Sequence, residues 1–384
     1  MILMNPEQKL VYYLSDPEIM RRDVEIIEPI DYTGIDWRMV IGRAIHLRTF
    51  PVFNHNLNEL ANEGVLDVPD HVLRISRRIG YEFLGQTMML QAEARKVFYS
   101  LNREGVNFLP IKGVLSGELL YPIPDTRFYR DIDLLFPDSW DLVGAENILT
   151  ELGYISRRPT SRGVPYKRMG RGSLEISFDL HRSFSFPEYH EFPKFDKLIH
   201  GAWCGSSIGL VIGTEVNVIQ PEYALMITCI NSFKDGSLKL TDYYDALQIL
   251  RRYPDIDLGL IEESVREFEC ALSLPLSLIL NERLPEKVRD FPIRYHESCK
   301  KCNRGICRVK SWSRLYASGA GKLIWKMRDL GYLPFSFRKY GLLHGLTCVR
   351  MQVASTALYT VDHMLKHGRE TKYPGLRKLI WRLG

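Results

Sequence analysis

The sequence predicts an α+β protein, in which a small mixed sheet is flanked by helical regions. Three observations support this. Apolar residues recur at helical spacing across residues 70–105. Short apolar or alternating stretches, typical of strands, fall between residues 106 and 184. Helical spacing returns after about residue 215, so the strands form one central block of the chain.

Turn and breaker residues divide this block into elements. In chain order we expect a strand at 106–111, a turn at Lys112-Gly113, a helix at 114–120, a loop at 122–127, a strand at 131–136, a helix at 137–154, a basic loop or hairpin at 157–172 and a strand at 173–184. Beyond the block, residues 220–253 predict two helices with a break at Asp235-Gly236.

The composition is that of an ordinary soluble globular protein. The chain has 384 residues, of which 45% are hydrophobic and 25% charged, and this length suggests two or three domains. No apolar run reaches the roughly 18 to 20 residues that span a bilayer. The N-terminus lacks the pattern of a signal peptide, and seven cysteines are too few for a disulfide scaffold. We therefore expect a cytoplasmic protein.

Charge is distributed unevenly along the chain. Residues 285–384 carry 21 Lys and Arg against 6 Asp and Glu, whereas residues 1–284 carry 30 basic and 40 acidic residues. An acidic body with a basic C-terminal quarter indicates two parts with different partners.

Two aspartates open the predicted strand at 131–136. Because side chains alternate along a strand, Asp131 and Asp133 share one face, while Ile132 and Leu134 face the core. Two carboxylates at this spacing suit hard cations, which prefer oxygen ligands. The alternative is a pair of solvated aspartates at a strand end, and Asp-x-Asp alone does not decide between the two.

A third carboxylate favours the metal interpretation. On the strand at 173–184, Asp179 lies on the same face as Glu175, Ser177 and His181. If this strand pairs beside the first, Asp179 joins Asp131 and Asp133. Three neighbouring carboxylates disfavour their own ionisation unless a divalent cation lies between them. Such a site suits two-metal phosphoryl or nucleotidyl transfer.

The Lys112-Gly113 turn adds a candidate phosphate site. It joins a predicted strand to a predicted helix, so its backbone N–H groups and the helix N-terminus are placed to receive phosphate oxygens. Gly113 would allow close approach of the backbone. The alternative is an ordinary strand-to-helix turn.

Taken in order, these segments resemble a known family. "LPIKGVLSGELLYPIPDTRFYRDIDLLF", "LGY", "FDLHRSF" and "PEYALMITCINSFKDGSLKLTDYYDALQIL" are similar to the uncharacterised nucleotidyltransferase family of the polymerase-beta-like superfamily, over roughly residues 80–284. The resemblance implies that Asp131 and Asp133 are paired metal ligands. It also implies that Asp179 is the third carboxylate, acting as general base or metal ligand for an incoming hydroxyl.

The resemblance also suggests residues that bind the nucleotide. Gly113 matches a turn that often reads Gly-Ser in the superfamily, but Val114 follows it here, so a phosphate-binding hydroxyl is missing. Lys112, Arg127 or Arg130 would then supply positive charge. In the helical subdomain, Lys239 is a further candidate phosphate contact, near Asp242 and Asp245, with a solvated helix face as the alternative. His181 orients Asp179, faces the substrate or is simply a strand-end histidine.

The C-terminal quarter lies outside the resemblance. His296, Cys299, Cys302 and Cys307 fit either a structural zinc site or free thiols activated by neighbouring Lys and Arg. The mixture of basic and aromatic residues across 285–384 fits nucleic-acid binding, contact with an anionic membrane surface, or packing against the acidic body.

Together these observations predict a nucleotidyltransferase core between helical flanks. We expect a helical N-terminal region at 1–100, the core at 101–215, a helical subdomain at 216–284 and a basic, mainly helical region at 285–384. The predicted activity is transfer of a nucleoside monophosphate from an NTP to a hydroxyl on a small molecule, a peptide or protein, or an RNA end, with Mg²⁺ or Mn²⁺. The alternative is a catalytically silent binding module that acts through its basic C-terminal region.

Overall fold

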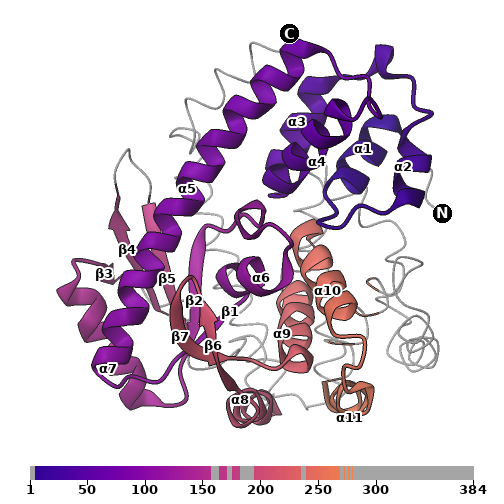
Figure 1. Ribbon diagram of the computed structural model, residues 1–384. Coiled ribbons are helices and arrows are strands. Elements are labelled where there is room, and N and C mark those ends of the chain that lie inside the picture. Colours follow the sequence, from indigo (N-terminus) through magenta and orange to yellow (C-terminus); the bar gives the residue numbers. More distant parts are fainter. Residues whose placement is uncertain are drawn as a thin grey trace, which may run out of the picture.

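The computed structural model shows helices packed around a mixed sheet, which confirms the α+β class (Figure 1). It describes residues 5–156, 164–170, 175–181, 194–234 and 239–268, together with Leu272, Leu276 and Ile279. The predicted zinc ligands and the whole basic region 285–384 lie outside the described residues. Within the described residues, no helix is both long enough and apolar enough to cross a membrane.

The central sheet has five strands in the order β1-β2-β5-β4-β3. Their bounds are β1 Leu109–Ile111, β2 Asp131–Leu135, β3 Ile155–Ser156, β4 Val164–Met169 and β5 Glu175–His181. Strands β2 and β5 pair in parallel, and the other neighbours pair antiparallel. The basic segment expected to be a loop or hairpin thus provides strand β4, which pairs with both β5 and β3.

The alternation of β2 and β5 determines what each face of the sheet presents. Ile132 and Leu134 of β2 are fully buried, as is Phe178 of β5, and all three belong to the main hydrophobic core. The polar residues between them face the other way. The parallel register sets Asp133 opposite Asp179, as the sequence predicted for two neighbouring strands with carboxylates on one face.

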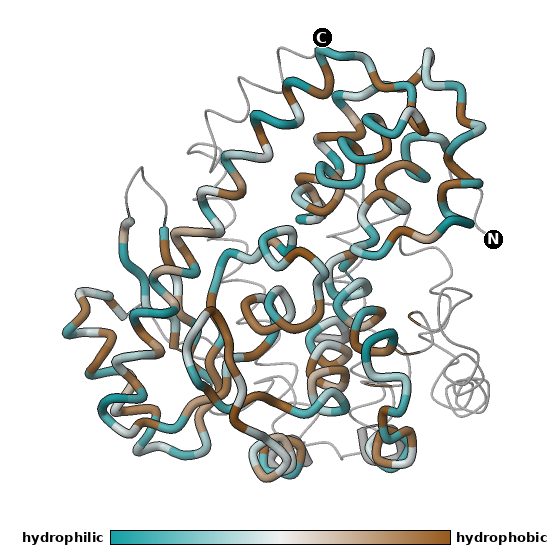
Figure 2. The backbone as a smooth tube through the Cα atoms, viewed as in Figure 1, coloured by the Kyte–Doolittle hydropathy of each residue, from teal (hydrophilic) through white to brown (hydrophobic). Residues whose placement is uncertain are grey.

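Helices from the N-terminal third form a second core beside the sheet. They are α1 Pro6–Leu14, α2 Arg21–Ile27, the short η1 Tyr32–Gly34, α3 Trp37–His46, α4 Phe50–Asn62 and α5 Asp70–Arg103. The long α5 joins the two cores: Ile79 and Phe83 pack among the N-terminal helices, whereas Val97 and Phe98 pack against the sheet. Figure 2 shows hydrophobic and hydrophilic residues alternating along these helices.

The remaining helices cover the sheet and extend beyond it. They and the hairpin are α6 Gly113–Leu120, η2 Pro124–Thr126, α7 Ser139–Glu151, α8 Lys194–Cys204, β6 Ser207–Val211, β7 Thr214–Val218, α9 Pro221–Lys234, α10 Leu240–Arg252 and α11 Leu258–Phe268. The two helices expected within 220–253 are present as α9 and α10, while the break predicted at Asp235-Gly236 lies outside the described residues. The β6–β7 hairpin runs across residue 215, where the sequence suggested a domain boundary.

Helix α10 lies at the centre of the molecule. Every residue from Thr241 to Leu250 is buried, and α10 packs against both α6 and α9. It also contacts α1, where the Tyr12 and Tyr243 hydroxyls lie 2.9 Å apart. The N-terminal helices, the sheet core and the later helices therefore meet at one helix.

Candidate active site

A compact group of potential metal ligands lies where β2 and β5 run side by side. One ligand atom from each of Asp133, Asp179 and His181 lies within 4.8 Å of the other two. His181 Nε2 is 2.8 Å from Asp133 Oδ1, and the Ser177 hydroxyl donates to Asp179 over 3.2 Å. The sequence left the role of His181 open; in the structure its ring nitrogen lies against Asp133, and its charge also acts on Asp179. Asp131 lies two residues before Asp133, outside this compact group.

Lys112 approaches the same carboxylate from the β1–α6 turn. Its Nζ is 3.2 Å from Asp133 Oδ1, and both side chains are largely buried. The backbone of Lys112 has φ 56°, in the left-handed region that non-glycine residues seldom adopt. Asp131, Asp133 and Asp179 together form the acidic cluster. The β1–α6 turn thus directs the ammonium group of Lys112 toward this acidic cluster.

The three carboxylates of the acidic cluster differ in their pKa values. Burial raises the pKa of Asp131, and the negative charge of Asp133 raises it further. Asp179 likewise has a raised pKa, from burial and then from Asp133 and Asp131. Burial would also raise the pKa of Asp133, but the charge of Lys112 and the hydrogen bond and charge of His181 hold it below its usual range. The neighbours of Asp133 therefore stabilise its negative charge, whereas the surroundings of Asp131 and Asp179 disfavour theirs.

The difference in pKa between Asp133 and the other two carboxylates is what a binding site for a divalent cation would show. Ligand atoms of two carboxylates and one imidazole lie within 4.8 Å of one another and could together hold a metal ion. Burial, and after it the neighbouring carboxylates, raise the pKa values of Asp131 and Asp179, so the protein by itself disfavours their charged forms. A bound divalent cation would stabilise those charged forms.

Gly113 and Val114 have packing roles that the sequence did not reveal. A Cβ at Gly113 would lie 2.6 Å from Tyr129 Cβ, so glycine is needed for the β1–α6 turn to pack against the segment that leads into β2. Val114 is 1% exposed and belongs to the main core. Position 114 is thus an apolar packing position, and the charged side chain of this turn is Lys112, which contacts Asp133.

Arg127 is held in a buried ion pair with α10. Its guanidinium makes two 2.7 Å hydrogen bonds to the two carboxylate oxygens of Asp245. Tyr121 donates to the same carboxylate over 2.9 Å. Arg127 is 8% exposed and Asp245 is 2% exposed. The structure therefore gives Arg127 a full set of protein partners, and contact with phosphate would require it to leave Asp245.

The other two predicted cations are Arg130 and Lys239. Arg130 immediately precedes Asp131, and its guanidinium lies 6.0 Å from the centre of the Phe128 ring. Lys239 is the N-cap residue of α10, and its positive charge acts to lower the pKa of Asp131. The charges of Lys112 and Lys239 thus act on Asp131 from two different elements, while Arg130 is its neighbour in the sequence.

Two further charged residues of the site were missed by the sequence analysis or given no role there. Arg48, between α3 and α4, lies close enough for its charge to act on Asp131. Asp242 on α10 acts in turn on Arg48 and Lys112. Arg48 lies more than 80 positions before Asp131 in a helical region, so no local motif connects the two. Only the packing of the N-terminal helices brings Arg48 to the site.

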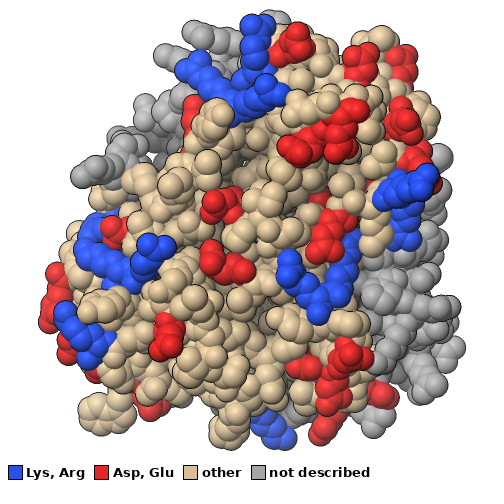
Figure 3. Space-filling view, in the orientation of Figure 1, with Lys and Arg blue, Asp and Glu red and all other residues tan. Residues whose placement is uncertain are grey.

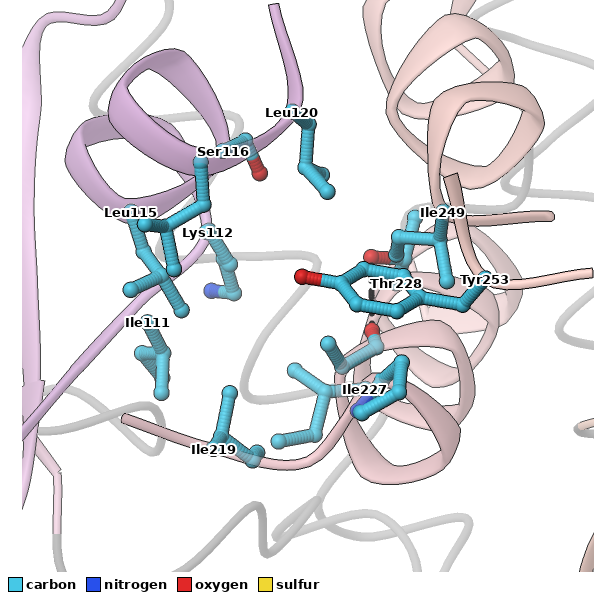
Figure 4. A pocket seen from close by; sticks show the side chains of 13 residues that line it. Ile111, Lys112, Leu115, Ser116, Leu120, Ile219, Ile227, Thr228, Ile249 and Tyr253 are labelled. Carbon is cyan, nitrogen blue, oxygen red and sulfur yellow. Dashed lines mark hydrogen bonds between the residues drawn. The ribbon is translucent and has the colours of Figure 1, made fainter. Parts of the chain in front are cut away.

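An apolar pocket lies between α6, α9 and α10. Its lining includes the aliphatic side chains of Leu115, Ile227 and Ile249, and Lys112 belongs to the lining as well. In Figure 4 the Tyr253 ring extends into this space with its hydroxyl directed toward α6. Because Lys112 also contacts Asp133, the pocket and the acidic cluster share one residue.

The visible surface carries charges of both signs. Figure 3 shows acidic and basic side chains interspersed over the face seen in Figure 1, without a continuous basic area. This agrees with the excess of acidic residues in the first 284 positions.

The fold and the site together define a protein of the nucleotidyltransferase type, with carboxylates on adjacent strands of a mixed sheet and a basic strand-to-helix turn. A family profile described as "uncharacterised nucleotidyltransferase" matches residues 33–285. The chain belongs to this family, as its motifs suggested. The match begins well before residue 80, so it includes α3, α4 and the whole of α5.

Solved structures show weaker likenesses. The antibiotic-resistance factor ANT(2'')-Ia is 15% identical with a TM-score of 0.35, over 49% of this chain and 96% of its own. An antigenic nucleotidyltransferase-like protein from Paracoccidioides brasiliensis is 18% identical with a TM-score of 0.30, over 50% of this chain and 92% of its own. A search of curated proteins gave no match.

Proposed function

We propose that this protein transfers a nucleoside monophosphate from an NTP to a hydroxyl acceptor, in a reaction that depends on Mg²⁺ or Mn²⁺. One observation carries the proposal: Asp133 and Asp179 lie opposite each other on neighbouring strands, within reach of a common ion, and Lys112 reaches Asp133 from the adjoining turn. Family membership supports nucleotidyl transfer in general. The site supports the metal requirement.

The acidic cluster would hold the metal. Asp133 and Asp179 would bind it directly with His181 beside them, and Asp131 would complete the ligand set or hold a second ion. When bound, the metal polarises the phosphates and stabilises the charge that develops during transfer.

The chain's own residues would position the reactants and move the proton. The acceptor oxygen attacks the α-phosphorus, the bond from that phosphorus to the oxygen bridging the α- and β-phosphates breaks, and pyrophosphate leaves. Asp179, which lies opposite Asp133 on the neighbouring strand, would take up the proton of the acceptor hydroxyl. Lys112, Arg130 and Lys239 would bind the triphosphate.

The acceptor would be selected by the helices around the core. Its class stays open among a small molecule, a peptide or protein, and an RNA end. The pocket between α6, α9 and α10 adjoins Lys112 and is lined largely by aliphatic side chains, which favours an apolar portion on whatever group it receives.

Calorimetry with each of the four NTPs, with and without Mg²⁺, tests this proposal on wild type and on the double variant Asp131→Asn/Asp133→Asn. We expect metal-dependent binding by wild type and its loss in the double variant. Pyrophosphate release in the presence of candidate acceptors then tests transfer. If wild type binds none of the four NTPs, the proposed activity is wrong.

A second function is favoured by the contacts of Asp133. Lys112 and His181 already satisfy this carboxylate, and no hydroxyl follows Gly113. A catalytically silent binding module, acting through residues 285–384, would have these properties. Nucleic-acid shift assays and liposome co-sedimentation of the full chain, without any NTP binding, would favour this alternative.

A further inference from the structure

The turn that ends α3 has a geometry usually built on glycine. The N–H of Arg48 donates to the carbonyl of Ile45 over 3.1 Å, and the N–H of Thr49 donates to the carbonyl of Ala44 over 3.0 Å. These two bonds define a Schellman motif, in which the residue just after the helix adopts the left-handed conformation. That residue is Arg48, with φ 62°.

Three other helices in the described chain end in the same way, and each uses glycine. Gly64 after α4, Gly105 after α5 and Gly153 after α7 have φ values of 75°, 69° and 82°. The N–H of each glycine donates to the carbonyl of the residue three positions earlier, as the N–H of Arg48 does. The sequence thus supplies glycine wherever this turn recurs in the described residues, except beside the acidic cluster.

An arginine at this position is unfavourable to the fold by itself. Left-handed backbone places a Cβ too close to the carbonyl oxygen, a strain that glycine avoids. Residues held in such conformations concentrate at functional sites. Lys112 is the second left-handed cation of the described chain, at φ 56°, and its ammonium contacts Asp133. Two cations in strained conformations therefore border the same three carboxylates.

Aromatic packing fixes the position of Arg48 relative to β2. Phe50, two residues after Arg48, lies 5.4 Å from Phe83 between ring centres, and Phe83 lies 4.8 Å from Phe128. Phe128 is three residues before Asp131, so this row of rings holds the α3–α4 turn against the segment that leads into the acidic cluster.

The charge environment of Arg48 indicates a place for an anion. Burial and the charges of Arg130 and Arg127 lower its pKa, while Asp131 and Asp242 act in the opposite direction. Among the described residues, its guanidinium forms neither a hydrogen bond nor an ion pair. Arg48 is only partly buried, so its donors are available to a ligand at the site.

We propose that Arg48 is a substrate-binding residue, contributed by the N-terminal helices, that binds the β- and γ-phosphates of the NTP. This rests on the proposed function. A guanidinium suits this role because its planar donors match phosphate oxygens in pairs. The N-terminal helices would then be part of the active site.

The test compares Arg48→Gly and Arg48→Lys with wild type, and uses Arg43→Asn on α3 as a control. Glycine removes the guanidinium and also suits the left-handed backbone, so the variant should fold with an unchanged or slightly higher Tm. Calorimetry with Mg²⁺ then measures binding of NTP, pyrophosphate and NMP. We expect Arg48→Gly to weaken NTP and pyrophosphate binding by about 10- to 100-fold and to leave NMP binding unchanged. Arg48→Lys should lose less, and Arg43→Asn nothing.

Each remaining outcome contradicts the proposal. If Arg48→Gly binds NTP as wild type does, Arg48 contacts no phosphate. If NTP and NMP binding weaken equally and Tm falls, Arg48 has a structural role. If wild type itself binds neither NTP nor pyrophosphate, the proposed function fails and this inference fails with it, which distinguishes that case from the first two.

Discussion

Two sets of buried charges lie close together in this protein and are balanced differently. Around α10, Arg127 pairs with Asp245 through two 2.7 Å bonds, and Arg251 pairs with Asp16 at 2.7 and 3.0 Å. Each carboxylate has its own guanidinium. In the acidic cluster, by contrast, Lys112 and His181 both contact Asp133, whereas Asp131 is affected by the charges of Lys112, Arg48 and Lys239 together.

The balance of charge indicates which buried carboxylates have a structural role and which form a binding site. A buried carboxylate with a matched partner holds elements together, since removing either partner leaves an uncompensated charge. Carboxylates that exceed their partners destabilise the fold and are retained where they bind something. The α10 ion pairs therefore join the N-terminal helices and the sheet core to α10, and the acidic cluster is the group of carboxylates that we propose binds a cation.

The largest expected effect is on activity. Asp133→Asn and Asp179→Asn should each lower the rate of pyrophosphate release by about 1,000-fold or more, because each removes a ligand for the metal that stabilises the transferring phosphate. The control is Asp36→Asn, an exposed N-cap residue of α3 where asparagine caps equally well. Retention of most activity in Asp179→Asn would contradict the proposed roles.

The next effect is on stability at the α10 ion pairs. Asp245→Asn should lower the free energy of unfolding by about 3 to 5 kcal/mol, because it leaves the Arg127 guanidinium buried without a matching charge. Urea denaturation measures this. Glu25→Gln, in an exposed pair with Arg21, should have no measurable effect. A small change in Asp245→Asn would mean that the buried pair is not a structural link.

Substitutions at Asp179 and Asp133 should change the free energy of unfolding by a smaller amount and in opposite directions. In metal-free protein, Asp179→Asn should raise the free energy of unfolding by about 1 kcal/mol, because it relieves repulsion. Asp133→Asn should lower it by a similar amount, because Lys112 and His181 lose their charged partner. Denaturation with chelator present compares the two. The same sign for both variants would contradict the charge assignment.

The smallest effect is in the pH dependence of stability. Asp131 and Asp179 have raised pKa values, so the folded chain holds their protons more tightly than the unfolded chain does. Their contribution to the free energy of unfolding is fully present below pH 3.8, the usual pKa of an aspartate. It is lost as pH rises through the pKa values that Asp131 and Asp179 have in the folded protein. Asp133 has a lowered pKa, so its contribution is present above 3.8 and is lost as pH falls. Metal-free Asp179→Asn should thus lose less stability than wild type as pH rises from about 4.

Much of the sheet could be predicted because the decisive signals are local. Ile132 and Leu134 alternate with the aspartates of β2, and Phe178 alternates with Asp179 on β5, so each strand specifies which face is buried. The pairing of β2 with β5 followed once both carboxylate faces were assumed to meet. Strand β4 lies in the segment that was expected to be a loop or hairpin, because its basic residues and glycines are typical of a loop.

The surroundings of the site could not be predicted because they depend on distant packing. Arg127 finds its partner Asp245 over 118 positions, and its position beside the Asp-x-Asp motif suggested a phosphate contact instead. The left-handed backbone of Arg48 has no signature in its sequence, since glycine is the usual signal for that turn. The role of Gly113 depends on Tyr129, which lies on a different segment.

Thermal unfolding of wild type and Asp179→Asn, with and without Mg²⁺, tests directly whether the acidic cluster binds a divalent cation. If the acidic cluster is completed by a cation, Mg²⁺ will raise the Tm of wild type, since a ligand that binds only the folded state stabilises it. Asp179→Asn will start from a higher metal-free Tm and respond little to Mg²⁺. If instead Mg²⁺ shifts neither protein, or shifts both equally, the three carboxylates do not form a metal site.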